Sequence, residues 1–160
     1  MSRVRSPAVL AGLGVLGQIL YPLVHGSVRN GDTIAIVVLI GTACVLHAWR
    51  CGSGRTVLLV VVLGGFLVEQ LGVHTGFPFG RYSYTSSLGV RVWRVPLVIA
   101  LAWPMVAWPA ALVARRLVGG FFFRVLLGAW ALATWDLFLD PQMVAAGHWR
   151  WNDPSPCHSH

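Results

Sequence analysis

Lysine is absent from the sequence, and only five of its 160 residues are acidic. Charged residues make up 11% of the chain and apolar residues 56%, whereas an ordinary soluble domain carries about a quarter charged residues. This composition excludes a disordered chain and argues against a soluble domain. The net charge of +7 comes from arginines placed between apolar runs and not from one basic block. We therefore expect arginines that flank membrane segments, and no nucleic acid partner.

Sequence motifs for metal and phosphate binding are also missing. The three cysteines form no CxxC pair, and the six histidines, including His148, His158 and His160, form no HxxH or HExxH pair. These absences argue against a zinc site, a di-iron hydroxylase and a metal-dependent hydrolase. There is no P-loop and no Gly-x-Ser-x-Gly nucleophile turn. We expect no metal site.

Five apolar runs divide the chain. About 20 apolar residues cross the hydrocarbon core of a bilayer as a helix, and only helices or closed barrels satisfy their backbone in lipid. We therefore predict an all-α, polytopic membrane helix bundle that forms one domain over residues 1–160. Pro141 is expected to end the last helix. The predicted spans and tail cover residues 8–24, 33–49, 56–73, 95–114, 119–139 and, for the polar tail, 141–160.

The arginines give an orientation. Seven lie at the N-terminus and in the links that share its side, and five lie on the opposite side, which favours a cytoplasmic N-terminus in a multi-pass cell membrane protein surrounded by lipid bilayer. With five spans, the end of the third span, the link after it and the end of the fifth span lie on one side. A single pocket is therefore expected to hold Glu69, His74, Arg81, Asp136 and Asp140.

The strongest chemical signal is the pair Asp136 and Asp140, near the end of the last apolar run. Their spacing of four places both carboxyl groups on one helical face. Two carboxylates in one site of low polarity favour the retention of a proton by one of them, and a protonated carboxyl group is a general acid. The simpler interpretation is that Asp140 is a solvated cap and Asp136 pairs with an arginine.

Glu69 is the third acid inside an apolar run, and Gln70 follows it. It is a candidate second acid, or a base that positions water; the alternative is a buried glutamate paired with Arg81 or bonded to Gln70. His74 lies five residues further on, too far round a regular helix to share the face of Glu69. We count it among the substrate-binding candidates, with an ordinary interfacial histidine as the alternative.

The link at residues 76–85 combines aromatic rings, an arginine and hydroxyl groups. Its glycines and proline exclude a regular helix. Aromatic faces stabilise cations, and Tyr82 or Tyr84 could orient a water molecule. The alternative is an aromatic belt at the headgroup level, which is also the expected place of Trp135. The predicted substrate-binding residues are Phe79, Arg81, Tyr82, Tyr84, Trp135 and His74.

Three stretches together resemble a known family. They are GFPFGRYSYT at 76–85, the proline-opened span from 95, and WDLFLDPQM at 135–143 with GHWRW at 147–151. In this order they resemble the integral-membrane carotenoid biosynthesis family of carotenoid 1,2-hydratases and bisanhydrobacterioruberin hydratases. The resemblance runs from about the third span to Trp151.

The resemblance implies addition of water to the terminal carbon–carbon double bond of an acyclic carotenoid, without metal or redox cofactor. Protonation by a carboxylic acid would give a tertiary carbocation, and water would add at the more substituted carbon. Asp136 or Asp140 is then the acid, and Glu69 is a second acid or the base that orients water. The residues expected to shape the pocket are Arg81, Tyr82 and Tyr84.

Family members carry further spans after the region of residues 149–151, where this chain continues with a short polar segment. The resemblance therefore implies a truncated member, a degraded copy, or one half of a split pair in which a second subunit supplies the missing helices. Two other functions remain open. One is a non-catalytic carotenoid-binding or partner subunit. The other is a carotenoid end-group cyclase, which uses the same protonation but loses a proton instead of capturing water.

Overall fold

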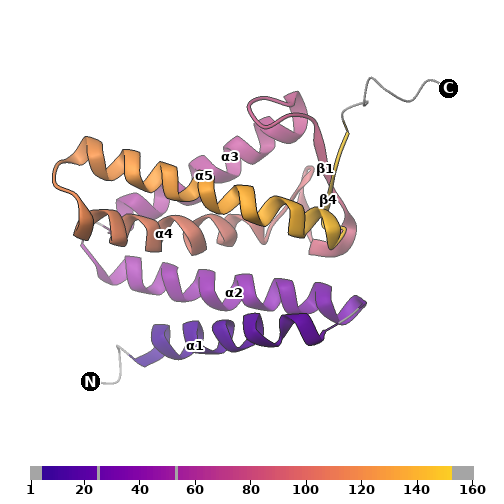
Figure 1. The fold of residues 1–160 in the computed structure, drawn as a ribbon, viewed down its shortest axis with the longest axis horizontal. Coiled ribbons are helices and arrows are strands. Elements are labelled where there is room, and N and C mark those ends of the chain that lie inside the picture. Colours follow the sequence, from indigo (N-terminus) through magenta and orange to yellow (C-terminus); the bar gives the residue numbers. More distant parts are fainter. Residues whose placement is uncertain (1–4, 25, 53, 153–160) are drawn as a thin grey trace.

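A computed structural model describes residues 5–24, 26–52 and 54–152, and helices dominate this part of the chain (Figure 1). The short 3-10 turn η1 (Tyr21–Leu23) follows the first helix. The predicted all-α bundle is confirmed, and α1, α2, α3 and α5 are each long and apolar enough to cross a membrane. The helices of the described residues are α1 (Arg5–Leu20), α2 (Ser27–Arg50), α3 (Gly54–Thr75), α4 (Ile99–Leu117) and α5 (Phe121–Ala145).

Helix α4 lies at the centre of the bundle. It packs against α2, α3 and α5, and α1 packs on α2 (Figure 1). Small residues permit this close approach: a Cβ atom on Gly41 would lie 2.7 Å from the carbonyl oxygen of Leu101, and one on Gly65 would overlap the ring of Trp103. Lipid tails are as apolar as the helices, so such contacts hold membrane helices together through van der Waals packing. Helix α5 has no buried residue, since it packs mainly along α4.

A cap of short elements covers the end of the bundle where α3 ends and α4 begins. We define the cap as residues 76–98 and 146–152. Strand β1 (Tyr82–Tyr84) pairs antiparallel with β4 (Trp149–Trp151), and β2 (Arg91–Val92) pairs with β3 (Val95–Pro96). The 3-10 turn η2 (Ser86–Leu88) lies between β1 and β2. The register of the first pair sets Tyr82 opposite Trp151 and Tyr84 opposite Trp149.

The predicted start of the fourth span is wrong. That span was expected at residues 95–114, but α4 begins at Ile99, because Val95 and Pro96 form β3. The chain reverses between β2 and β3 at Trp93, whose φ angle is 55°. A tight hairpin of this kind leaves no sequence signal beyond Pro96, which suits a first helical turn equally well.

The predicted end of the fifth span is also wrong. That span was expected at residues 119–139 with Pro141 as the stop, but α5 continues to Ala145 with Pro141 inside it. Proline disturbs the preceding turn of a helix, and here the side-chain amide of Gln142 donates to the carbonyl oxygen of Phe138 at 3.0 Å. This bond is next to the carbonyl of Leu137, the one that Pro141 leaves without its helical donor. The helix nevertheless continues, so Asp140 lies inside its last turns.

The expected polar tail at 141–160 is partly built into the fold, because residues 141–145 belong to α5 and residues 149–151 form β4. Residues 153–160, with Cys157, His158 and His160, lie outside the described part of the chain.

His148 joins the cap to α2. Its side chain is completely buried; Nδ1 lies 2.8 Å from the Ser87 hydroxyl and Nε2 lies 3.3 Å from the Thr33 hydroxyl. Thr33 donates to the Arg29 carbonyl oxygen at 3.0 Å, so its oxygen is free to accept from Nε2–H. The neutral ring with the proton on Nε2 fits both contacts, and burial lowers the pKa of His148 below its ordinary 6.5.

This burial predicts acid sensitivity of the cap. Below the ordinary pKa of histidine the unfolded chain binds a proton that the folded chain excludes, so stability falls with pH until the folded-state pKa is reached. We expect the Tm in detergent to fall between about pH 7.5 and about pH 5.5, and to fall less in His148→Gln. The exposed His74→Gln is the matched control and should keep the wild-type slope. An equal slope in all three proteins would contradict the prediction.

Candidate active site

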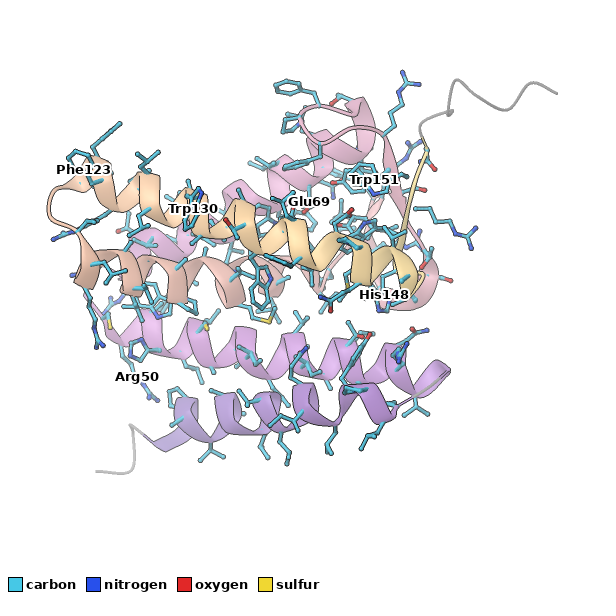
Figure 2. All side chains as sticks on the ribbon, viewed as in Figure 1. Arg50, Glu69, Phe123, Trp130, His148 and Trp151 are labelled. Carbon is cyan, nitrogen blue, oxygen red and sulfur yellow. The ribbon has the colours of Figure 1, made fainter. Side chains whose placement is uncertain are left out.

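A cavity of about 710 Å³ lies between α3, α4, α5 and the strands β1 and β4. Its walls are mostly apolar side chains of α4 and α5, and three carboxyl groups face it. Figure 2 shows Glu69 of α3 and Trp151 of β4 near the end of α5 that leads into the cap. The lining residues used below are Glu69, Phe79, Tyr82, Tyr84, Trp103, Trp135, Asp136, Asp140, Trp149 and Trp151.

Two tyrosines hold Glu69. The hydroxyl groups of Tyr82 and Tyr84 donate to the same carboxyl oxygen, Glu69 Oε2, at 2.6 Å and 2.8 Å. Alternate residues of a strand face the same side, so β1 presents both rings to α3. Burial, and then the nearby Glu69, raise the pKa of both tyrosines above the ordinary range. The phenols therefore keep their protons and act as donors to Glu69.

Two tryptophans hold Asp140 in a parallel way. The indole Nε1–H of Trp149 donates to Asp140 Oδ1 at 2.7 Å, and that of Trp151 donates to Oδ2 at 3.2 Å. Each oxygen accepts one bond, which is the pattern of an acceptor-only carboxylate. The indole is a donor only, so it cannot take a proton from this group.

Asp136 differs from Glu69 and Asp140 because no side chain of the described residues holds it. It lies one turn before Asp140 on the cavity wall and is exposed. Among the described residues its side chain makes no hydrogen bond to the protein, so its carboxyl group is the one left open to a ligand. The described residues also hold no group of three or more His, Cys, Asp or Glu side chains placed to bind a metal ion.

Four aromatic rings from the paired strands form one face of the cavity, which we call the aromatic ribbon: Tyr82, Tyr84, Trp149 and Trp151. Neighbouring ring centroids are 5.7 Å apart for the two tyrosines, 5.6 Å for Tyr82 and Trp151, and 5.8 Å for Tyr84 and Trp149. These separations are typical of favourable aromatic pairs. The ribbon therefore positions both acid-binding pairs as one rigid unit.

The structure brings most of the predicted site residues together. The three acids line the cavity with Phe79, Tyr82, Tyr84 and Trp135.

Two predicted residues, Arg81 and His74, are not among the cavity's lining residues. Arg81 is exposed and directly precedes β1, which begins at Tyr82. His74 is about 140° round α3 from Glu69. It lies in a separate shallow groove beside Gln70 and Trp93, and its Nδ1 is 2.8 Å from the Gln70 carbonyl oxygen.

Sequence reasoning missed three contributors. Trp149 and Trp151 were named only within the GHWRW stretch that carries the resemblance, and Trp103 was not singled out. The spacing Trp-x-Trp at 149–151 repeats the Tyr-x-Tyr spacing at 82–84, and this shared period of two was the available sign of strand pairing. No pattern marks Trp103, whose place depends on the contact of its ring with Gly65 on α3.

Gly72 makes room for the tyrosine that holds Glu69. A Cβ atom there would lie 2.9 Å from the Tyr82 hydroxyl and 3.2 Å from Phe79, so Gly72→Ala should displace Tyr82 from Glu69. We expect an activity loss of about tenfold, because hydrogen bonds to charged groups contribute about 1.5–3 kcal/mol. Gly64→Ala on the same helix, where a Cβ atom meets nothing within 4 Å, should keep wild-type activity. The prediction fails if the two variants keep the same activity.

The bundle and its four long apolar helices define a membrane protein, with an apolar cavity that three carboxyl groups line. Residues 32–157 match the model of the carotenoid biosynthesis protein family. This match covers most of the chain, including the three acids and the aromatic ribbon, so the protein belongs to that family and has a role in carotenoid biosynthesis. No curated protein and no solved structure matches the chain.

Proposed function

We propose that the protein hydrates the terminal carbon–carbon double bond of an acyclic carotenoid end group. The observation that carries this proposal is the arrangement of three carboxyl groups around one apolar cavity. Two of them accept hydrogen bonds from neutral donors, and the third, Asp136, is left open. A general acid without a competing partner, placed beside an apolar slot, suits the protonation of a hydrocarbon double bond.

In the proposed reaction, Asp136 gives its proton to the less substituted carbon of the double bond, and the electron pair of the π bond forms the new C–H bond. The more substituted carbon becomes a tertiary carbocation. Water then adds to that carbon and releases one proton to a carboxylate of the site. The net change is the addition of one water molecule, with no electron transfer, so the residues present suffice for the chemistry.

The carbocation would form between two anionic groups and beside the aromatic ribbon. Aromatic faces attract cations within about 6 Å of the ring centroid. Glu69 and Asp140 are fixed in place by their four donors, so they need not reorganise as the charge develops. This arrangement favours the charged intermediate over the neutral substrate, which is the requirement for catalysis.

The size of the cavity fits an end group and not a whole carotenoid. Its volume lies within the usual range of ligand pockets, about 300–1,000 Å³. The lining residues of α5 run from Leu132 to Pro141, nine helical rises and therefore about 14 Å along the helix. An acyclic carotenoid is about as long as the hydrocarbon core is thick, roughly 30 Å. The remainder of the polyene would therefore lie in the bilayer.

The proposal is tested by expressing the protein in cells that accumulate lycopene or a longer acyclic precursor. We expect a product heavier by one water molecule, and a tertiary alcohol at the end group by nuclear magnetic resonance. A ring at the end group would indicate a cyclase. Unchanged carotenoid, with the protein present in the membrane fraction, would contradict an independent hydratase.

One observation favours a second candidate, a non-catalytic carotenoid-binding or partner subunit. Helix α5 forms a wall of the cavity although none of its residues is buried, and the helices of another subunit could cover that face. This candidate predicts that carotenoid copurifies with the protein unchanged, and that conversion requires a second membrane subunit.

A further inference from the structure

The two tryptophans that hold Asp140 fix its negative charge beside the carbocation, but the reaction described so far does not say which carboxylate receives the proton of the attacking water. They come from a strand that follows α5 after a short turn, and they reach back to the same helix over nine and eleven residues. Pairing of β4 with β1 fixes their direction, because Trp149 and Trp151 are opposite Tyr84 and Tyr82. The fold therefore directs two indole donors to the carboxyl group of Asp140, one helical turn from the candidate proton donor Asp136.

We propose that Trp149 and Trp151 are positioning residues that hold Asp140 as the acceptor of the proton released when water captures the carbocation, so that an alcohol forms and not an alkene. This inference rests on the proposed hydration. Each oxygen of a carboxylate has two acceptor positions, and the indoles occupy one on each oxygen. The remaining positions are available to a water molecule, and the carboxylate cannot rotate to follow the solvent.

The spacing along α5 suits this division of roles. Cβ atoms four residues apart on a helix are separated by about 5–6 Å. When Asp136 protonates one carbon of the double bond, this separation leaves room for one water molecule between Asp140 and the other carbon. Glu69 lies on α3, across the cavity from α5. Its Oε2 already accepts hydrogen bonds from two phenol groups, so in this scheme Glu69 remains a fixed negative charge.

The proton that the reaction consumes is returned by residues of the same helix, α5. Asp136 loses its proton to the substrate, and Asp140 gains one from the attacking water as the C–O bond forms. Transfer of that proton from Asp140 to Asp136, one turn away, restores the starting state. If Asp140 is not held, the cation loses a proton instead. Loss from a neighbouring methyl group gives an isomeric alkene, and loss from the carbon that was protonated returns the substrate.

Deuterated water separates these outcomes. Substrate that is protonated but not captured returns with deuterium at the reacting carbon, so the ratio of alcohol to deuterium-labelled alkene measures capture directly. We expect this ratio to fall about tenfold or more in the double variant Trp149→Phe with Trp151→Phe, which keeps the rings but removes both donors to a charged group. Trp130→Phe, an exposed residue of α5 outside the cavity, should keep the wild-type ratio.

Asp140→Asn provides the second test. This variant should still incorporate deuterium into alkene, and its ratio of alcohol to labelled alkene should fall as in the tryptophan double variant. Adding the two tryptophan changes to Asp140→Asn should not lower the ratio further. A wild-type ratio in the tryptophan double variant, or an Asp140→Asn protein that incorporates no deuterium, would overturn the inference. If the double variant does not fold, Asp140→Asn alone decides. Absence of alcohol from the wild type would instead overturn the proposed hydration.

Discussion

Asp136→Asn is expected to reduce carotenoid conversion by about 10²- to 10⁴-fold, the usual contribution of a general acid. Asparagine keeps the size and polarity of the side chain but has no acidic proton to give to a double bond. Among the three carboxyl groups of the cavity, Asp136 alone makes no hydrogen bond to the described residues, so its loss should leave the packing around it unchanged. The measurement is the initial rate of alcohol formation in membranes, normalised to protein.

The matched control is Asp32→Asn. Asp32 is the described acidic residue that lies outside the cavity, on α2 near Gly17 of α1, so this change should leave conversion unaltered. Asp136 would lose its assignment as the proton donor if its asparagine variant formed alcohol at the wild-type rate. Near-complete loss in Asp140→Asn together with retained activity in Asp136→Asn would move the acid role to Asp140.

Removing both hydroxyl groups from the aromatic ribbon, by Tyr82→Phe with Tyr84→Phe, should have the second-largest effect. Glu69 would keep its place inside the cavity wall but would lose both donors to Oε2. Truncating the partners of a buried charge costs about 2–5 kcal/mol, so we expect conversion to fall by about 10²-fold or more. Each single variant should show a smaller loss, because one phenol remains.

The chain contains three tyrosines, and the third supplies the control. Tyr21 lies in η1, where Arg29 stacks over its ring with 5.1 Å between the guanidinium carbon and the centroid. Tyr21→Phe keeps this stacking and should keep wild-type conversion. The double tyrosine change should also lower the Tm, because it leaves the Glu69 carboxylate without its donors. Adding Glu69→Gln should recover part of that Tm, because a neutral amide does not need two donors. Equal Tm values for the double variant with and without Glu69→Gln would show that Glu69 does not depend on the tyrosines.

Sequence patterns were sufficient for the helical part of the fold. Long apolar runs separated by arginines or by glycine-rich turns have few structural solutions in a bilayer, and the spacing of Asp136 and Asp140 places them on one helical face. Which links share a side of the membrane followed from the number of spans. The order of the spans therefore predicts that Glu69 and the two aspartates lie close together.

The strand pairing of the cap could not be predicted from these sequence patterns. Strands of two or three residues are too short to show a period, and the pairing of residues 82–84 with 149–151 joins segments far apart in the sequence. The hydrogen bonds from Trp149 and Trp151 to Asp140 depend on that pairing. They also depend on the continuation of α5 past Pro141, which local rules oppose. Local propensity alone does not show that a helix continues through a proline.

The position of α5 has a practical consequence for biochemical work. This helix contributes two of the three acids, yet it is attached chiefly along α4 and at β4. Hydrocarbon on its outer side therefore supplies much of the support that a neighbouring helix would give in a soluble bundle. Small, mobile detergents should loosen this wall first, so conversion should survive best in nanodiscs or native vesicles, and loss of turnover should precede loss of helicity when lipid is stripped away.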